Sequence, residues 1–144
     1  MIQIYRKEEN IYQIKGYEER LVAQNSSQKV SDWFLAKAKV LEKAECDTLA
    51  FKALDQALEL FKEKNKHFLN IQLYKAHLLI KLQSLREANQ LLQQIEESSL
   101  SIEDYQSLAI SYILRSECEL KKNQIESSQE LADKAEKLFD LHNL

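Results

Sequence analysis

Apolar and polar residues alternate along the chain with the period of an α-helix. From about residue 28 onward, apolar side chains recur three or four positions apart and the positions between them are polar. This spacing gives each of six segments one apolar face, as in amphipathic helices. We predict helices over residues 28–44, 48–63, 67–82, 85–98, 102–121 and 124–141. Asp47 is the expected cap of the second helix, and residues 84–87, 101–104 and 123–126 have the form, or nearly the form, of capping boxes.

The composition favours a wholly helical chain. The 144 residues include one Gly and no Pro. Sheets joined by tight turns usually need Gly where φ is positive and Pro in their loops. The predicted connections are short, which makes consecutive helices antiparallel neighbours. We therefore predict an all-α domain.

Two consecutive helix pairs share one pattern of large and small residues. The first pair carries it at Phe34, Ala38, Leu41, Ala50, Leu54 and Ala57. The second pair carries it 38 positions later, at Gln72, Ala76, Leu79, Ala88, Leu92 and Ile95. A large–small–large first helix followed by a small–large–small second helix resembles the tetratricopeptide repeat, a helix-turn-helix unit of about 34 residues, in a longer variety of about 38–40 residues. Small residues at these places let two helix backbones approach closely.

The third pair matches the family in its residue types but with a different spacing. Its first helix carries Tyr105, Leu108, Ala109 and Tyr112, and its second carries Ser128, Ala132 and Ala135, seven residues later than the standard unit would place them. Seven residues are about two helical turns. We therefore expect a third hairpin that is about one turn longer on each helix.

The resemblance implies an α-solenoid of three antiparallel helix pairs, over about residues 28–65, 66–100 and 101–144, preceded by an extra N-terminal segment. Residues 1–25 do not fit the repeat. Ile4, Ile11, Ile14 and Leu21 favour a helix there, whereas the alternation on both sides of KEEN also fits a small hairpin.

Net charge, apolar run length and cysteine content limit the classes of function that we expect. The net charge is −3 and the basic clusters are short, so a nucleic-acid-binding surface is not expected. No apolar run is long enough to span a membrane. Cys46 and Cys118 are too few for a disulfide framework, so we predict a cytoplasmic protein with reduced thiols.

No motif indicates catalysis, a cofactor or a metal. His67, His77 and His142 lack the spacing of zinc or di-iron ligands, and the single Gly argues against a phosphate-binding loop. A Cys-dependent enzyme, with Cys118 as nucleophile and His77 as base, is a less favoured alternative.

The resemblance also implies a concave groove lined by the first helix of each pair. The groove positions of the family fall on Leu35, Lys39, Glu42, Asn70, Leu73, His77, Ile80, Lys81, Glu103, Gln106, Ile110 and Ile113. Polar residues that clamp a peptide carboxylate in some members are replaced here by Leu35 and Leu73. The apolar path through Leu35, Leu73, Ile80, Ile110 and Ile113 instead predicts a protein partner that supplies a helical or extended apolar peptide.

Several alternatives share this fold. Residues 1–25 of the same chain are a competing occupant of the groove. The domain also fits a peptide- or signal-sensing part of a bacterial-type transcriptional regulator, or a small chaperone. The apolar end of the last helix, at Leu138, Phe139 and Leu141, suggests a homodimer through that helix.

Overall fold

Helices account for all the regular secondary structure in the part of the chain that the computed structural model describes, residues 14–21 and 27–144. A helical segment over residues 14–21 precedes six helices: α2 (Ser27–Lys43), α3 (Asp47–Glu59), α4 (Lys66–Lys81), α5 (Leu85–Ser101), α6 (Tyr105–Lys121) and α7 (Ile125–His142). The all-α prediction is confirmed, and each of the six predicted helices is present with its ends displaced by no more than four residues. Of the N-terminal segment, residues 14–21 are helical, and residues 1–13 lie outside the described part.

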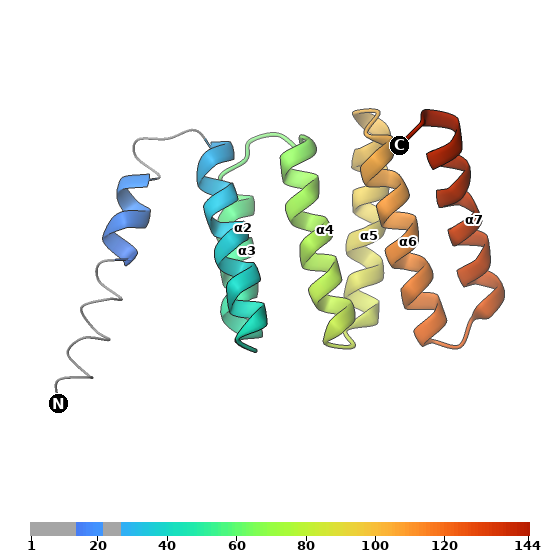
Figure 1. The fold of residues 1–144 in the computed structure, drawn as a ribbon, viewed down its shortest axis with the longest axis horizontal. Coiled ribbons are helices and arrows are strands. Elements are labelled where there is room, and N and C mark those ends of the chain that lie inside the picture. Colours follow the sequence, from blue (N-terminus) through green and yellow to red (C-terminus); the bar gives the residue numbers. More distant parts are fainter. Residues whose placement is uncertain (1–13, 22–26) are drawn as a thin grey trace.

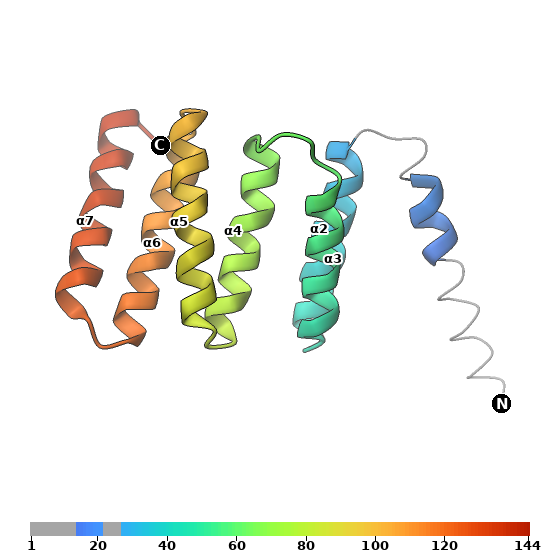
Figure 2. The same cartoon turned by 180° about the vertical axis from the view of Figure 1, so that it is seen from behind.

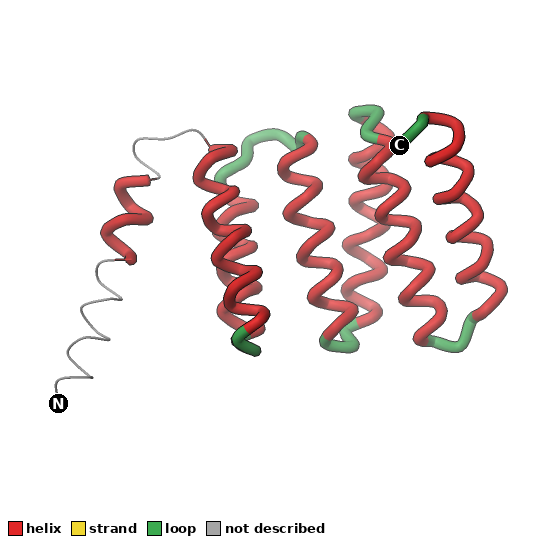
Figure 3. The backbone as a smooth tube through the Cα atoms, viewed as in Figure 1, coloured by secondary structure: helices red, strands yellow, loops and turns green. Residues whose placement is uncertain are grey.

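The helices stand side by side along the long axis of the molecule (Figure 1), and the view from behind shows the same order (Figure 2). Each helix from α2 to α7 contacts the next one, and α4 also contacts α6. Short loops reverse the chain between helices, with a longer connection between α3 and α4 (Figure 3). The result is a repeat-like array in which α2, α4 and α6 are each followed by an antiparallel partner.

Four of the turns have the same backbone geometry. Glu45, Gln83, Glu103 and Asn123 adopt positive φ angles of 60°, 63°, 56° and 61°. The residue after each donates its main-chain N–H to the carbonyl five positions earlier, as Cys46 does to Leu41 at 2.8 Å and Gln124 does to Glu119 at 2.9 Å. This is the Schellman motif, which satisfies the last carbonyls of a helix. Glycine usually takes the left-handed position, so this chain makes its sharp turns with residues that occupy that conformation less readily.

The Schellman turns explain why the predicted caps are mostly wrong. The left-handed residue is followed at once by the N-cap, so α3 is preceded by Cys46, with Asp47 already inside the helix. Ser84 has the cap position but makes no side-chain cap bond. Asn123 is the left-handed residue, and the cap position belongs to Gln124. The caps that do bond are Asn65, which accepts from the N–H of Phe68, and Asp104, which accepts from the N–H of Ser107 at 3.1 Å.

The third hairpin is not a full turn longer on each helix than the second one, which corrects the expectation from sequence. Helices α6 and α7 contain 17 and 18 residues, against 16 and 17 in α4 and α5. Aligned on the left-handed residues, the third pair has the spacing of the first two, and its pattern falls on Tyr112, Ser116, Glu119, Ser128, Ala132 and Ala135. The match at Tyr105 and Ala109 was two turns out of register, because serine occupies the close-contact position that alanine holds in the other pairs.

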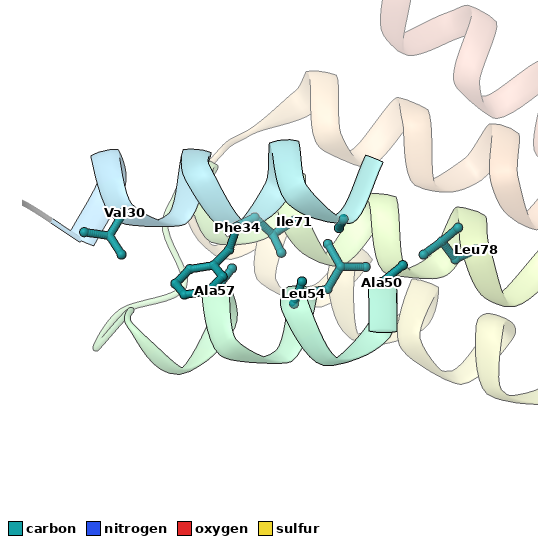
Figure 4. Close-up of a cluster of buried hydrophobic side chains, with 9 residues drawn as sticks. Val30, Phe34, Ala50, Leu54, Ala57, Ile71 and Leu78 are labelled. Carbon is teal, nitrogen blue, oxygen red and sulfur yellow. The ribbon is translucent and has the colours of Figure 1, made fainter. Parts of the chain in front are cut away.

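The core lies between the helix layers in two clusters. One joins α2, α3 and α4 around Phe34 and Leu54 (Figure 4), and the other joins α4, α5 and α6 around Leu69 and Leu92. The predicted small residues lie at the centres of these clusters, with Ala38, Ala50, Ala76 and Ala88 fully buried. A methyl group at each place allows the close helix approach that positions the exposed faces of α2, α4 and α6.

Candidate binding surface

A polar cluster surrounds Glu42 where α2 faces α4. The hydroxyl of Tyr74 donates a hydrogen bond to Glu42 Oε1 at 2.5 Å. On the other carboxylate oxygen, Lys81 Nζ lies at 3.7 Å and His77 Nε2 at 3.9 Å. The Glu42 side chain is only 14% exposed, whereas those of His77 and Lys81 are 52% and 44% exposed. The structure thus brings three predicted groove residues together, with His77 and Lys81 beside the mostly buried carboxylate of Glu42.

Tyr74 contacts both Glu42 and Lys39 in this cluster, and it is not among the predicted groove residues. Burial raises the pKa of its phenol well above the usual value, and the bond to Glu42 raises it further. The phenol is therefore a proton donor at any physiological pH. The ammonium of Lys39 lies 5.6 Å from the centre of the Tyr74 ring, within the range of a cation–π contact. One sequence signal could have identified Tyr74. It is a large aromatic residue one turn before the predicted groove residue His77.

The cluster presents two ammonium groups and one imidazole to solvent. Lys39, His77 and Lys81 are exposed, while Glu42 is held below them. Asp47 lies 4.0 Å from Lys81 and is partly buried. This arrangement can receive carboxylate and main-chain carbonyl groups from a ligand, because exposed ammonium and imidazole groups donate hydrogen bonds to such acceptors.

The continuous apolar path expected along the groove is not present. Leu73 is 6% exposed and Ile80 is 1% exposed, so both belong to the core and are wrongly placed on a binding surface. Ile110 and Leu114 of α6 pack against the cluster that contains Leu73 and Ile80. Leu73 and Ile80, which were expected to meet a partner, therefore pack in a core cluster that α6 of the same chain covers.

The remaining predicted groove residues differ in their exposure. Glu103 is the left-handed residue of the turn before α6 and lies outside that helix. On the turn alignment, the counterparts of Leu73 and His77 in α6 are Ile113 and Glu117. Within the predicted set, Lys39, Asn70, His77, Lys81, Glu103, Gln106 and Ile113 are exposed, and Leu35, Glu42 and Ile110 are partly buried.

The described N-terminal residues lie against the outer side of α2. Lys37 Nζ contacts Glu18 Oε1 at 2.6 Å, and Trp33 donates its indole N–H to the same oxygen at 3.3 Å. Tyr17 meets the Trp33 ring edge-on at 5.2 Å. A cavity of about 360 Å³ remains between Ile14 and α2. Trp33 and Lys37 are not groove residues, so the contacts of residues 14–21 are not those of a groove occupant.

The residues proposed for cysteine chemistry lie in different environments. Cys118 is fully buried in the core cluster of α4, α5 and α6, and burial raises the pKa of its thiol. A reactive cysteine instead has a lowered pKa and access to substrate. His77 is exposed and contacts Tyr74 and Glu42. Within residues 14–21 and 27–144, no group of three or more His, Cys, Asp or Glu side chains could hold a metal ion.

Comparisons with protein families, with curated proteins and with solved structures found no match. No helix in the described part of the chain has the length and apolar character needed to cross a membrane.

Proposed function

We propose that this protein is a non-enzymatic protein-interaction module, built as a tetratricopeptide-like α-solenoid of three helix pairs. It binds a polypeptide segment of a partner protein across α2, α4 and α6. The observation that carries the proposal is the cluster around Glu42, in which two first helices direct Lys39, His77 and Lys81 outward from one fixed carboxylate. The described side chains near Glu42 pack or form ion pairs, and none of them is a reactive nucleophile. This supports a non-enzymatic role.

The ligand chemistry follows from the two halves of this surface. Over α2 and α4 the exposed groove residues include the ammonium groups of Lys39 and Lys81, which suit acidic side chains and main-chain carbonyls. Over α6 the predicted groove residue Ile110 is apolar and only partly buried, which suits apolar contact. The partner segment is therefore extended, acidic at one end and apolar at the other. This replaces the wholly apolar peptide expected when Leu73 and Ile80 were assigned to the groove.

Selection from a displayed library of random peptides tests this proposal. We expect enriched peptides that carry acidic residues at one end and apolar residues at the other, in either order. Their affinity, measured by calorimetry, should fall at least tenfold in the variant Lys39→Glu/Lys81→Glu, a change of about 1.4 kcal/mol or more in binding free energy.

The control is Lys62→Glu/Lys64→Glu, which makes the same charge change on exposed residues of the loop between α3 and α4. Equal loss of affinity in both variants would show a general charge effect and would contradict binding at the Glu42 cluster. Circular dichroism should show the same helix content in all three proteins.

A further inference from the structure

Each first helix pairs one cation with the helix that precedes it. Lys37, Lys75 and Arg115 lie eight residues before Glu45, Gln83 and Asn123, the left-handed residues of the three hairpins. Lys75 pairs with Asp55 of α3 at 2.8 Å. Arg115 makes two contacts of 2.9 and 3.0 Å with Glu96 of α5 and donates from Nε to Asn89 at 3.2 Å. The position therefore marks where one hairpin docks on the one before it.

The same rule applies to the N-terminal helical segment. Lys37 of α2 pairs with Glu18 at 2.6 Å, as Lys75 pairs with α3 and Arg115 with α5. Residues 14–21 thus stand in the place of a second helix before the first hairpin. At this end of the array, residues 14–21 therefore cover the side of α2 that carries Lys37.

The opposite end of the array leaves its docking positions open in the described chain. Ile113 and Leu120 of α6 correspond to Leu73 and Ile80 of α4, since each pair lies ten and three residues before its left-handed residue. Leu73 and Ile80 are covered by α6, whereas Ile113 and Leu120 are 46% and 56% exposed. The difference in exposure comes from the packing of α6 on α4, since no described helix packs on α6 in the same way.

The acceptor for a cation is also repeated at this end. Glu136 and Gln129 of α7 correspond to Glu96 and Asn89 of α5, thirteen and six residues after the left-handed residue. Glu96 is 14% exposed because Arg115 and α6 cover it. Glu136 and Gln129 are exposed, and Glu136 has no ion pair with any described residue. We call Ile113, Leu120, Gln129 and Glu136 the end surface.

We propose that the end surface binds an amphipathic helix of a partner protein, and that this helix carries two apolar residues four positions apart followed directly by Arg or Lys. This is the pattern of Ile110, Leu114 and Arg115, by which α6 covers α4 and α5. The partner's apolar residues pack on Ile113 and Leu120. Its cation binds Glu136 and Gln129, as Arg115 binds Glu96 and Asn89.

Charge opposes a second copy in the isologous arrangement as the occupant. Asp133, Glu136 and Asp140 are exposed along one side of α7, and a two-fold contact would bring this acidic row close to its own copy. Like charges brought together at an interface oppose association, whereas a basic helix is attracted. On the end surface a basic partner helix is therefore the expected occupant, and a homodimer through Leu138, Phe139 and Leu141 stays a prediction.

A peptide with the sequence of residues 105–121 and the change Cys118→Ser serves as the probe, because it carries the docking pattern of α6. Titration of the fluorescent peptide with the full chain should give saturable anisotropy. Glu136→Lys in the protein should weaken binding at least tenfold. Glu130→Lys is the matched control, since the corresponding Gln90 of α5 stays exposed although α5 is covered by α6. The peptide variant Arg115→Glu should fail on the original protein and bind the Glu136→Lys protein.

Three results would overturn the proposal. The first is absence of saturable binding at about 1 mM protein, which corresponds to less than about 4 kcal/mol of binding free energy. The second is equal weakening by Glu136→Lys and Glu130→Lys. The third is a sedimentation profile in which the protein alone is dimeric and Ile113→Arg is monomeric, which would assign the surface to a second copy. The Lys39→Glu/Lys81→Glu variant should bind this peptide normally, so the outcome is independent of the function proposed above.

Discussion

Ser116 of α6 and Ser128 of α7 exchange hydrogen bonds across the last hairpin. The Ser116 hydroxyl donates to the carbonyl of Ser128 at 2.8 Å, and the Ser128 hydroxyl donates to the carbonyl of Ser116 at 2.9 Å. The corresponding contacts in the first two hairpins are between alanines, Ala38 with Ala50 and Ala76 with Ala88. The third hairpin therefore keeps the close approach of its helices but stabilises it with polar groups.

This exchange predicts a strong coupling between the two serines. Ser128→Ala alone should lower the free energy of unfolding by about 1–2 kcal/mol, because it removes a bond and leaves the Ser116 hydroxyl short of one partner. The double variant Ser116→Ala/Ser128→Ala recreates the alanine contact of the other hairpins and should cost less than the sum of the single changes. Urea denaturation of all four proteins gives the coupling. Strict additivity would show that the hydroxyls act separately.

The left-handed turn residues predict sites where glycine stabilises the protein. Glu45 and Gln83 hold φ angles of 60° and 63°, a conformation that costs a residue with a Cβ about 1–2 kcal/mol. Glu45→Gly and Gln83→Gly should each raise the free energy of unfolding by about 0.5–1 kcal/mol, after the greater freedom of glycine in the unfolded chain is subtracted. Thermal melting measures the change. Gln93→Gly, on an exposed helical position of α5, should instead lower stability by about 1 kcal/mol.

The burial of Leu73 predicts opposite outcomes for two arginine substitutions at corresponding positions. Leu73→Arg places a charge in the core between α4 and α6 and should destabilise the protein by more than about 3 kcal/mol. Ile113→Arg is at the equivalent position of α6, where 46% of the side chain is exposed, and should change stability by less than about 1 kcal/mol. Denaturant unfolding followed by circular dichroism distinguishes them. Similar losses would mean that the end surface is also part of the core.

Two of the inter-hairpin ion pairs, Arg115–Glu96 and Lys75–Asp55, should differ in strength. Arg115 and Glu96 are 21% and 14% exposed and meet through two hydrogen bonds, whereas Lys75 and Asp55 are 29% and 53% exposed and meet through one. Arg115→Met should therefore cost about 1.5–3 kcal/mol, and Lys75→Met no more than about 1 kcal/mol. Added salt should weaken the Lys75 pair more, because its charges are better reached by ions. Equal costs in 0.05 and 0.5 M NaCl would refute this difference.

The buried thiol predicts a loss of stability at alkaline pH. Burial raises the pKa of Cys118, so the unfolded chain releases this proton at a lower pH than the folded chain does. The stabilisation is present below the pKa of the unfolded thiol, about 8.5, and declines as pH rises from there toward the folded value. The melting temperature should fall between pH 8 and 10, and Cys118→Ala should reduce that slope. A thiol reagent should label partly exposed Cys46 well before Cys118.

The helices and the close contacts between them were legible in the sequence because they depend on local spacing. Residues 38, 50, 76 and 88 are all alanine. A small residue four positions from a large one indicates a close contact between the two helices of a pair. The register of the third pair was missed because its close-contact residues are serine rather than alanine. Ser116 and Ser128 do not look like a small-residue contact until their reciprocal hydrogen bonds are seen.

The binding surfaces depended on which helix covers which, and this is a property of the tertiary structure. Leu73 and Ile113 are apolar residues at the same position of successive first helices. One is buried and the other is half exposed, because α6 packs on α4 and no described helix packs on α6 in the same way. Glu42 becomes the centre of a cluster because Tyr74 reaches it across 32 residues of sequence. By itself the sequence determined the helices, their small-residue contacts and the absence of catalytic motifs. The stacking of the hairpins decided which apolar and charged positions remained free to bind, because burial is set by neighbours that local periodicity does not specify.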